Sequence, residues 1–222
     1  MMYLDKITVP KILIPILLTF LFLCASTSSH AQADYHVNAS TGNDTNDGLS
    51  WSTAFATLQK AIDEAVANDE IWVAEGTYYP SKESDGTTDS QREFTFFIDF
   101  DVKIYGGFPN TGTPTMGDRD WENHKTILSG DLDMDDTDGL TGTALLTNGT
   151  RNDNSYTVVR TENLSSTCLI NGFFVEGGNA NLGSGIVTPP NHLGGGMLNS
   201  YSNPTLTNCS FSNNSADFDG GG

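Results

Sequence analysis

The chain offers one dense group of candidate metal ligands, an acidic run at residues 130–139. Counted from its first aspartate, positions 1, 3 and 5 carry Asp, the spacing with which loops present oxygen atoms to a hard cation such as calcium. An EF-hand would also need Gly at position 6 and Glu at position 12, where this chain has Asp136 and Gly142. We therefore favour a solvated acidic turn, and the candidate metal site is an irregular calcium loop. Its carboxylates would come from Asp131, Asp133, Asp135, Asp136 and Asp138.

Catalytic bases and acid–base pairs are harder to find. A calcium-assisted lyase would need a basic residue beside the acidic run, and the nearest are Arg151 and Arg160, which we expect to be ordinary surface arginines. A glycoside hydrolase needs two carboxylates about 5–9 Å apart, and the adjacent Asp135 and Asp136 fix no such distance. The sequence has no Ser-His-Asp or phosphate-loop pattern. We therefore predict no catalytic residue, and we expect any calcium to stiffen the loop.

Histidine and aromatic residues give weaker signals. His36, His124 and His192 have no cysteine or carboxylate at metal-ligand spacing, so we expect each to lie alone on the surface or in a loop. Aromatic residues concentrate in the first half of the chain, where outward-facing rings could stack on sugars, although strand aromatics mostly pack in cores. They are Trp72, Tyr78, Tyr79, Phe94, Phe96, Phe97, Phe100, Tyr105, Phe108 and Trp121.

Residues 1–33 have the features of a secretory signal peptide. Lys6 and Lys11 precede an apolar run at residues 12–24, which is followed by small residues and an Ala-Gln-Ala site ending at Ala33. The run is shorter than the roughly 20 residues of a membrane-spanning helix. We predict that the protein is exported, to the extracellular space or the outer-membrane surface, and that the mature chain, 34–222, has no transmembrane helix.

The charge of the chain restricts its partners. It has 28 acidic and 10 basic residues and a net charge of −18. Nucleic acid is bound by clustered Lys and Arg, and anionic lipid repels an acidic surface, so we expect neither partner. Such a charge keeps a chain soluble in a salty exterior and can also collect divalent cations, and the two interpretations are compatible. Cys168 and Cys209 remain after the leader, and we expect two free, buried thiols rather than a bridge.

A repeat in the carboxyl-terminal part of the chain indicates the architecture. Triple glycines stand at 194–196 and 220–222, 26 residues apart, whereas residues 175–180 recur 36 positions later at 211–216. The difference between the two spacings corresponds to an inserted loop at 181–192. A short period in a chain rich in Asn, Gly, Ser and Thr predicts a solenoid of stacked parallel strands, because the strands are too short for a sandwich.

The repeat also predicts how one rung turns. The two copies align an apolar triad, and its members can all point inward only if the strand alternation changes phase after the first of them. A residue in the left-handed region makes this change, and the alignment places Gly172 and Asn208 there. We expect asparagines at successive corners to hydrogen-bond along the stack. The aligned pairs are Ile170 with Leu206, Phe173 with Cys209, and Val175 with Phe211.

One amphipathic helix is expected near residues 54–66, with Thr53 as its N-cap. Its apolar face needs a surface to cover, and the open end of a solenoid provides one, so we predict that this helix caps the first rung. The cap would take in about residues 34–80 and the rungs about 90–222. The apolar stripe is Leu58, Ala61, Ile62, Ala65 and Val66. Strands are expected at 35–37, 70–73, 77–79, within 94–108, at 126–129 and at 156–159.

At these residues the chain resembles the right-handed parallel β-helix proteins of the pectin-lyase-like superfamily, in particular Bacteroidota-type exported surface proteins and the chlamydial polymorphic outer-membrane proteins. Residues 211–214 fit the FxxN repeat of the latter, and 194–197 approximate their GGA[ILV] motif, with a third glycine and a methionine as departures. Residues 47–78 look like the capping helix and first strand of such domains. The resemblance implies an all-β fold, a right-handed parallel β-helix (solenoid) with an N-terminal α-helical cap.

That superfamily includes polysaccharide lyases and hydrolases as well as adhesins without catalysis, so the fold does not decide the function. Our leading hypothesis is an exported, adhesin-like surface scaffold that presents loops such as 181–193 to a polysaccharide or a host or cell-surface protein. The alternative is a carbohydrate-active enzyme of the pectate-lyase or polysaccharide-hydrolase type with catalytic rungs outside this chain. The last glycines open a rung with nothing after it, so we also expect a fragment, truncated at its carboxyl end.

Overall fold

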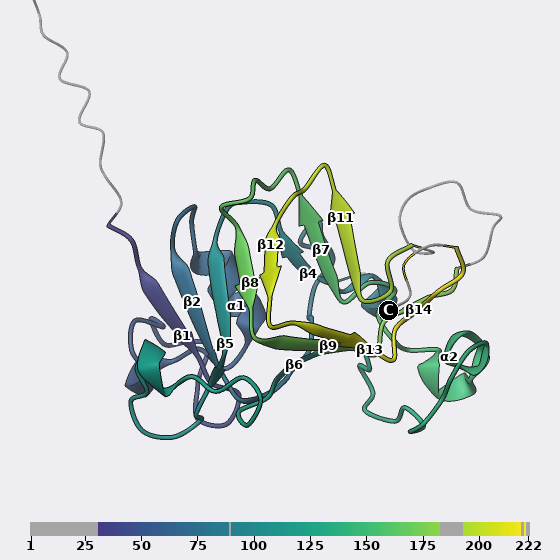
Figure 1. The fold of residues 1–222 in the computed structure, drawn as a ribbon, viewed down its shortest axis with the longest axis horizontal. Helices are drawn as coiled ribbons and strands as arrows, with labels where there is room; N and C mark the ends of the chain where they lie inside the picture. Colours follow the sequence, from purple (N-terminus) through teal and green to yellow (C-terminus); the bar gives the residue numbers. More distant parts are fainter. Residues whose placement is uncertain (1–30, 89, 183–192, 219, 221–222) are drawn as a thin grey trace, which may run out of the picture. The chain divides into compact units, whose positions relative to one another are not determined.

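The computed structural model describes residues 31–222 except 89, 183–192, 219 and 221–222. Residues Gln32–Gly222 group together as one unit, and that unit is described here by itself. Short strands dominate it and helices are few (Figure 1). Every strand pair among the described residues is parallel, so the predicted all-β class with parallel strands is confirmed.

The strands form three main sheets and one small ladder. Sheet A contains β1 (Asp34–Val37), β2 (Glu70–Ala74), β5 (Lys103–Phe108), β8 (Leu169–Asn171) and β12 (Thr205–Thr207). Sheet B contains β3 (Gly76–Tyr78), β6 (Thr126–Ser129), β9 (Phe173–Glu176) and β13 (Ser210–Ser212). Sheet C contains β4 (Phe96–Ile98), β7 (Val159–Glu162) and β11 (Met197–Ser200). The ladder pairs β10 (Asn179–Ala180) with β14 (Ser215–Ala216).

From β2 onward, successive strands along the chain belong to different sheets, in a repeating order. β2, β3 and β4 lie in sheets A, B and C, and β5, β6 and β7 repeat that order. The next pass takes β8 through sheet A, β9 through sheet B, β10 through the small ladder and β11 through sheet C. The last pass begins in the same way, with β12 in sheet A, β13 in sheet B and β14 in the ladder. Each pass adds one parallel strand to a sheet, which explains why neighbouring strands are distant in sequence.

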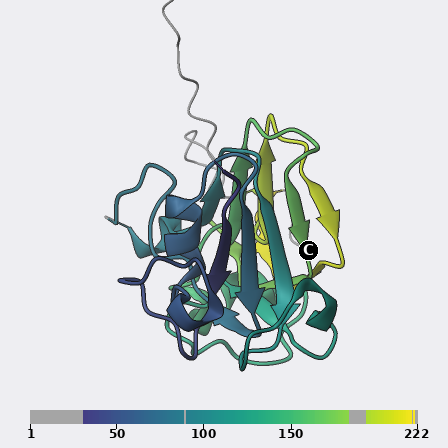
Figure 2. The ribbon, with the colours of Figure 1, turned by 90° about the vertical axis from the view of Figure 1, so that its left-hand side faces the viewer.

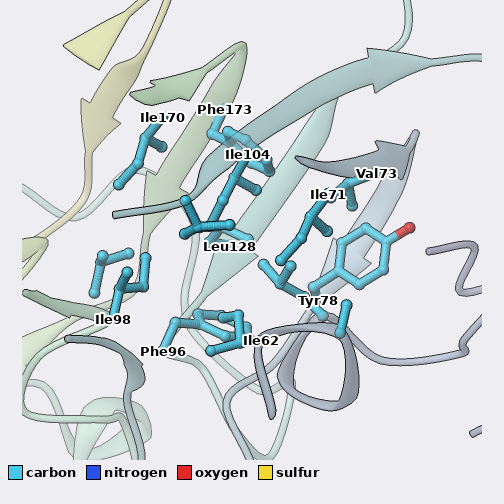
Figure 3. Packing of buried hydrophobic residues seen from close by; sticks show 14 of the residues in the cluster. Ile62, Ile71, Val73, Tyr78, Phe96, Ile98, Ile104, Leu128, Ile170 and Phe173 are labelled. Atoms are coloured by element: carbon cyan, nitrogen blue, oxygen red, sulfur yellow. The ribbon is translucent and has the colours of Figure 1, made fainter. Parts of the chain in front are cut away.

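The core consists of apolar side chains that lie in register across the sheets (Figure 3). In sheet A, Ile71, Ile104 and Ile170 are register partners, and all three are buried. In sheet B, the buried Tyr78 and Leu128 are partners in the same way. Because side chains alternate along a strand, each strand sends every second residue into this core.

The predicted inward triad is confirmed in position. Ile170, Phe173 and Val175 are buried, and Leu206 and Phe211 pair with the first and the last of them. Leu206 is nevertheless 40% exposed, whereas Ile170 is 5% exposed. The reason is that β8 has a strand on each side, while β12 is the last strand of sheet A. Burial of a side chain in this ladder therefore requires a neighbour above and below it.

The predicted turn between sheets A and B is also confirmed. Gly172 and Asn208 have φ angles of 88° and 53°, so both occupy the left-handed region. The Nδ2 atom of Asn208 donates to Oδ1 of Asn171 over 3.3 Å, which links two successive corners along the stack. The repeat seen in the sequence thus corresponds to a repeated backbone conformation.

The helix α1 (Leu58–Glu64) is shorter than predicted and starts later. Its N-cap is Thr57, whose hydroxyl accepts from the backbone N–H of Lys60, and not Thr53, which ends a 3-10 turn, η1 (Trp51–Thr53). Asp44 accounts for the difference, because its carboxylate accepts from the N–H and the hydroxyl of Thr57 and fixes the chain there.

The helix α1 lies beside the amino-terminal strands (Figure 2), and its apolar residues belong to the core. Leu58 and Ile62 are buried, but Val66 is 43% exposed because it lies beyond the end of the helix. The helix contacts β1, β2 and β4, of which β1 is the end strand of sheet A and β4 the end strand of sheet C. Its position agrees with a cap on the first strands.

Two strand predictions need correction. The strand expected at 156–159 is found as β7 at Val159–Glu162, because the residues before it bond to loops instead of to a sheet: the N–H of Ser155 donates to Gly130 and that of Tyr156 to Arg92. The strand signal within 94–108 divides into β4 and β5. The strand at 126–129 is confirmed as β6.

A second, smaller aromatic layer covers the outer face of sheet A. His36, Trp72 and Tyr105 are register partners on this face. The His36 ring lies 4.7 Å from the ring of Trp51 and 5.4 Å from that of Trp72, measured between centroids, and is 9% exposed. The prediction that His36 is a surface or loop histidine is therefore wrong, because the two rings that enclose it come from separate segments, η1 and β2.

Arg119, in the connection between β5 and β6, closes this layer. Its guanidinium lies 5.1 Å from the ring centroid of Tyr105 and 5.6 Å from that of Phe108. It also donates to the carbonyl oxygen of Gly106 and to both oxygens of Asn171. These aromatic rings are packed under a loop, so they form a layer of the fold and not an open platform for sugars.

The remaining sequence predictions have mixed outcomes. Cys168 and Cys209 are both free thiols, as expected, but only Cys168 is buried as predicted, and Cys209 is half-buried. His124 is half-buried, and its Nδ1 lies 3.0 Å from Glu75 Oε2. No helix in the described part of the chain is long and apolar enough to span a membrane. Most of the predicted signal peptide and of the loop 181–193, with His192, lies outside the described residues.

Gly178 gives a test of the close packing between passes of the chain. A Cβ atom there would lie 1.9 Å from the carbonyl oxygen of Gly195. Gly178→Ala should therefore lower the free energy of unfolding by about 3 kcal/mol, measured by urea denaturation. Gly149→Ala is the matched control, because a Cβ there meets nothing within 4 Å, and we expect it to be neutral or slightly stabilising. Equal stability of the two variants would contradict this packing.

Candidate functional site

Three long connections leave from the same corner, where the chain passes from sheet B to sheet C. They are residues 79–95, 130–158 and 177–196. The turns from sheet C to sheet A, at 99–102, 163–168 and 201–204, are short. Figure 1 shows the 130–158 connection, with its helix α2 (Ala144–Thr147), beside β14 on this side of the molecule. We call the described residues of these three connections the loop corner.

Arg92 ties all three connections of the loop corner together. It lies in a 3-10 turn, η2 (Gln91–Glu93), and its Nε donates to the carbonyl oxygen of Asn154 over 2.9 Å. Its Nη2 donates to the carbonyl oxygen of Asn179 and to Oδ1 of Asn181, over 2.9 and 2.7 Å. The guanidinium also lies 4.1 Å from the ring centroid of Tyr156. One side chain thus fixes the relative positions of loops from three passes of the chain.

Arg151 is the second tie, and it is 1% exposed. It ends the 3-10 turn η4 (Gly149–Arg151), and its Nη1 lies 2.7 Å from Oδ2 of Asp136. Its Nη2 donates to the carbonyl oxygens of Gly178 and Asn213, and its Nε to that of Leu145. The prediction of a surface arginine is wrong here, because its acceptors come from distant segments that no local pattern reveals.

The structure brings three of the five predicted aspartates together. Asp131, Asp135 and Asp136 each offer a carboxylate oxygen within 4.8 Å of the others. The two oxygens of Asp131 accept the backbone N–H groups of Asp135 and Asp136, which folds the loop around this carboxylate. Asp133 and Asp138 are exposed and lie outside the group. The sequence therefore identified the loop and all three converging carboxylates, but it also named two aspartates that do not converge with them.

A cleft beside this group adds further acidic character. It is lined by Asp131, Asp136 and Asp138 from the loop, by the buried Arg151, and by Glu176 at the end of β9. Loss of solvent raises the pKa of the Glu176 carboxyl above its ordinary value, and repulsion by Asp131 adds to the shift. Loss of solvent likewise raises the pKa of Asp136, against the opposing effects of Asn154 and Arg151.

The arrangement suits a hard cation better than it suits catalysis. One oxygen of Asp136, Oδ1, is buried without a hydrogen-bond partner, while its other oxygen accepts from Arg151 and Asn154. A cation held by three carboxylates would lower the repulsion among them. Arg151 cannot serve as a base, because its guanidinium donates to four oxygens of the surrounding loops and arginine stays protonated in proteins.

Sequence reasoning missed Arg92 and Glu176 as parts of this corner. Glu176 lies within the repeated segment and aligns with Ser212, so the repeat placed it on a strand but gave no sign of its acidic neighbours. Arg92 stands in a polar stretch without any pattern, and its role depends on carbonyl oxygens more than sixty residues away along the chain. A hydrogen bond to a backbone carbonyl cannot be predicted from residue types, because every residue has such a carbonyl.

The fold and the site together define a protein of short parallel strands whose loops gather at one corner around an acidic cleft and a buried arginine. The chain belongs to the family described as "Protein of unknown function (DUF1565)", whose model matches residues 40–217. No curated protein and no solved structure gives a significant match to the chain.

Arg151 is expected to be the most sensitive residue of the loop corner. Arg151→Met removes one partner of a buried ion pair and takes one hydrogen-bond donor from Asp136 and from each of three carbonyl oxygens, so the free energy of unfolding should fall by about 4 kcal/mol. Arg160→Met is the control, because Arg160 is partly exposed and its distance to Glu162 is 3.5 Å, and we expect a loss of about 1 kcal/mol or less. Similar losses in chemical denaturation would show that Arg151 is not a structural tie.

Calcium binding at the acidic loop remains a prediction with a direct test. A site with a dissociation constant of about 1 mM would stabilise the protein by roughly 1.4 kcal/mol at about 10 mM calcium, which raises the melting temperature by about 3–5 °C. Asp135→Asn should abolish this increase, and Asp133→Asn should keep it, because only Asp135 belongs to the converging group. Thermal unfolding with and without calcium measures both. No increase in the unaltered protein would leave the solvated acidic turn as the answer.

Proposed function

We propose that residues 34–222 form a right-handed parallel β-helix that works, after export, as a non-catalytic scaffold at the cell surface. The parallel pairing and the repeated order of the sheets support this fold, since a chain that coils in one direction adds one strand to each sheet per turn. The features of residues 1–33 support export. In this proposal the partner is a polysaccharide or a cell-surface protein.

The observation that carries the proposal is the locking of the loop corner. Arg92 and Arg151 hold loops from successive passes side by side through hydrogen bonds to backbone carbonyls. Binding residues are commonly found on loops that a rigid framework positions, and loops that are already ordered lose less entropy on binding. The loop corner therefore suits the presentation of a fixed surface to a partner.

The same corner gives little support to the alternative, a carbohydrate-active enzyme. The basic residue that lies beside the acidic group, Arg151, is buried and holds the loops together. An acidic cleft also repels a polyuronate chain unless a cation lies between them. The alternative would therefore require catalytic residues from outside this chain.

Incubation of the purified protein with polygalacturonate and calcium tests the proposal. We expect no unsaturated uronate product and no new reducing ends, with a known pectate lyase as the positive control. Binding of the protein to isolated cell-wall polysaccharide or to intact cells, without turnover, would support a scaffold. Formation of product that is lost in the Asp135→Asn variant would contradict it and assign catalysis to the loop corner.

A further inference from the structure

A cleft at the amino-terminal end of the stack is separate from the loop corner's acidic group. It lies between α1, the first part of the 79–95 connection and the residues around β4. A second hollow continues it along α1 and shares Gln59, Asp63 and Lys82 with it, so the two form one groove. The groove is lined on one side by polar residues of α1 and the connection, and on the other by Phe97, Asp99 and Phe100, among others.

Gln59 is the unusual residue of this groove. It is 4% exposed, and its Nε2 donates to Oδ1 of Asp63 over 3.1 Å. This bond fixes the orientation of the amide, because a carboxylate can only accept. The other amide atom, Oε1, is then buried with no hydrogen-bond partner. Such an acceptor is costly to leave without a donor, so a hydrogen bond from a molecule bound in the groove would be favourable.

The charges around Gln59 indicate what kind of donor would fit. Asp63 is already paired with the ammonium of Lys82, at 2.5 Å. The exposed Asp99 and one oxygen of Glu83 remain as acceptors in the groove, since the other oxygen of Glu83 takes the N–H of Ser90. A ligand that meets these groups must donate hydrogen bonds, and a positive charge on it would be favourable.

The apolar residues of the groove indicate that the ligand also has an apolar part. Phe97, Phe100 and Ile62 offer a surface for an alkyl chain. Arg160 already places its guanidinium 5.5 Å from the ring centroid of Phe97, which shows that an aromatic face here accepts a cation. A flexible chain that ends in an ammonium group matches both the apolar surface and the unpaired acceptors.

We propose that this groove binds an alkylammonium group, with its chain against Phe100 and Ile62 and its nitrogen donating to Oε1 of Gln59 and to the carboxylate of Asp99. The group could belong to a free aliphatic diamine or to a lysine side chain of a bound protein. The diamine form is independent of the scaffold function, whereas the lysine form rests on it.

Isothermal titration calorimetry with matched ligands tests the proposal. We expect cadaverine, or a glycine-flanked lysine peptide, to bind at least about tenfold more tightly than pentanediol and the acetyl-lysine peptide, which lack the charge. Binding of cadaverine alone assigns a small-molecule site, and preferential binding of the peptide assigns a protein partner. Equal binding of pentanediol and cadaverine, or no binding of either cation, would overturn the proposal without affecting the assays of the loop corner.

Variants of the groove separate a specific site from general attraction to an acidic protein. Gln59→Leu should weaken binding about tenfold and, without ligand, raise the melting temperature, because it removes a buried acceptor that has no donor. Asp99→Asn, at an exposed position, should also weaken binding and keeps the test valid if Gln59→Leu does not fold. The control is the double variant Asp131→Asn with Asp135→Asn, which removes two charges elsewhere and should leave binding within about twofold. An equal loss in the control would contradict a specific groove.

Discussion

Register between parallel strands is the constraint on which the rest of this structure depends. Ile71, Ile104 and Ile170 lie on one another in sheet A because each pass of the chain returns to the same position along the sheet. A slip of one residue would turn this whole ladder of side chains to the outside. The corner at Gly172 and Asn208 keeps the register, since a left-handed residue changes the phase of the alternation at the same place in both passes. Packing, loop positions and both candidate sites follow from this repetition.

The loops depend on the sheets, but polar side chains determine how the loops lie. At the loop corner, Arg92 and Arg151 hold neighbouring connections together by donating hydrogen bonds to their backbone carbonyl oxygens. On the outer face of sheet A, Arg119 has a similar role above Tyr105 and Phe108. Three of the few basic residues of a strongly acidic chain are thus used to hold loops against strands. Few basic side chains are then left to neutralise the negative charge of the exposed carboxylates. Because of this excess of negative charge, we expect cations as the ligands of both clefts.

The two candidate sites differ in what supports them. At the loop corner, three converging carboxylates and an unpaired oxygen of Asp136 suit a hard metal ion, and Arg151 already supplies part of the positive charge. In the groove beside α1, the unpaired acceptor of Gln59 is accompanied by Phe97 and Phe100, so an organic cation with an apolar chain suits it better. Membership in a family described only as of unknown function leaves these local arrangements as the basis for functional work.

The sequence by itself determined the features that repeat locally. Three features were predictable because side-chain alternation and backbone preferences act over a few residues. They are the spacing of Ile170 and Leu206, the left-handed corner at Asn208 and the apolar face of α1. The tertiary structure decided everything that joins distant segments. It buried Arg151 and enclosed His36 among aromatic rings, and it moved the N-cap from Thr53 to Thr57. These outcomes depend on carbonyl oxygens, rings and carboxylates from other passes of the chain, whose proximity exists only after the strands have stacked.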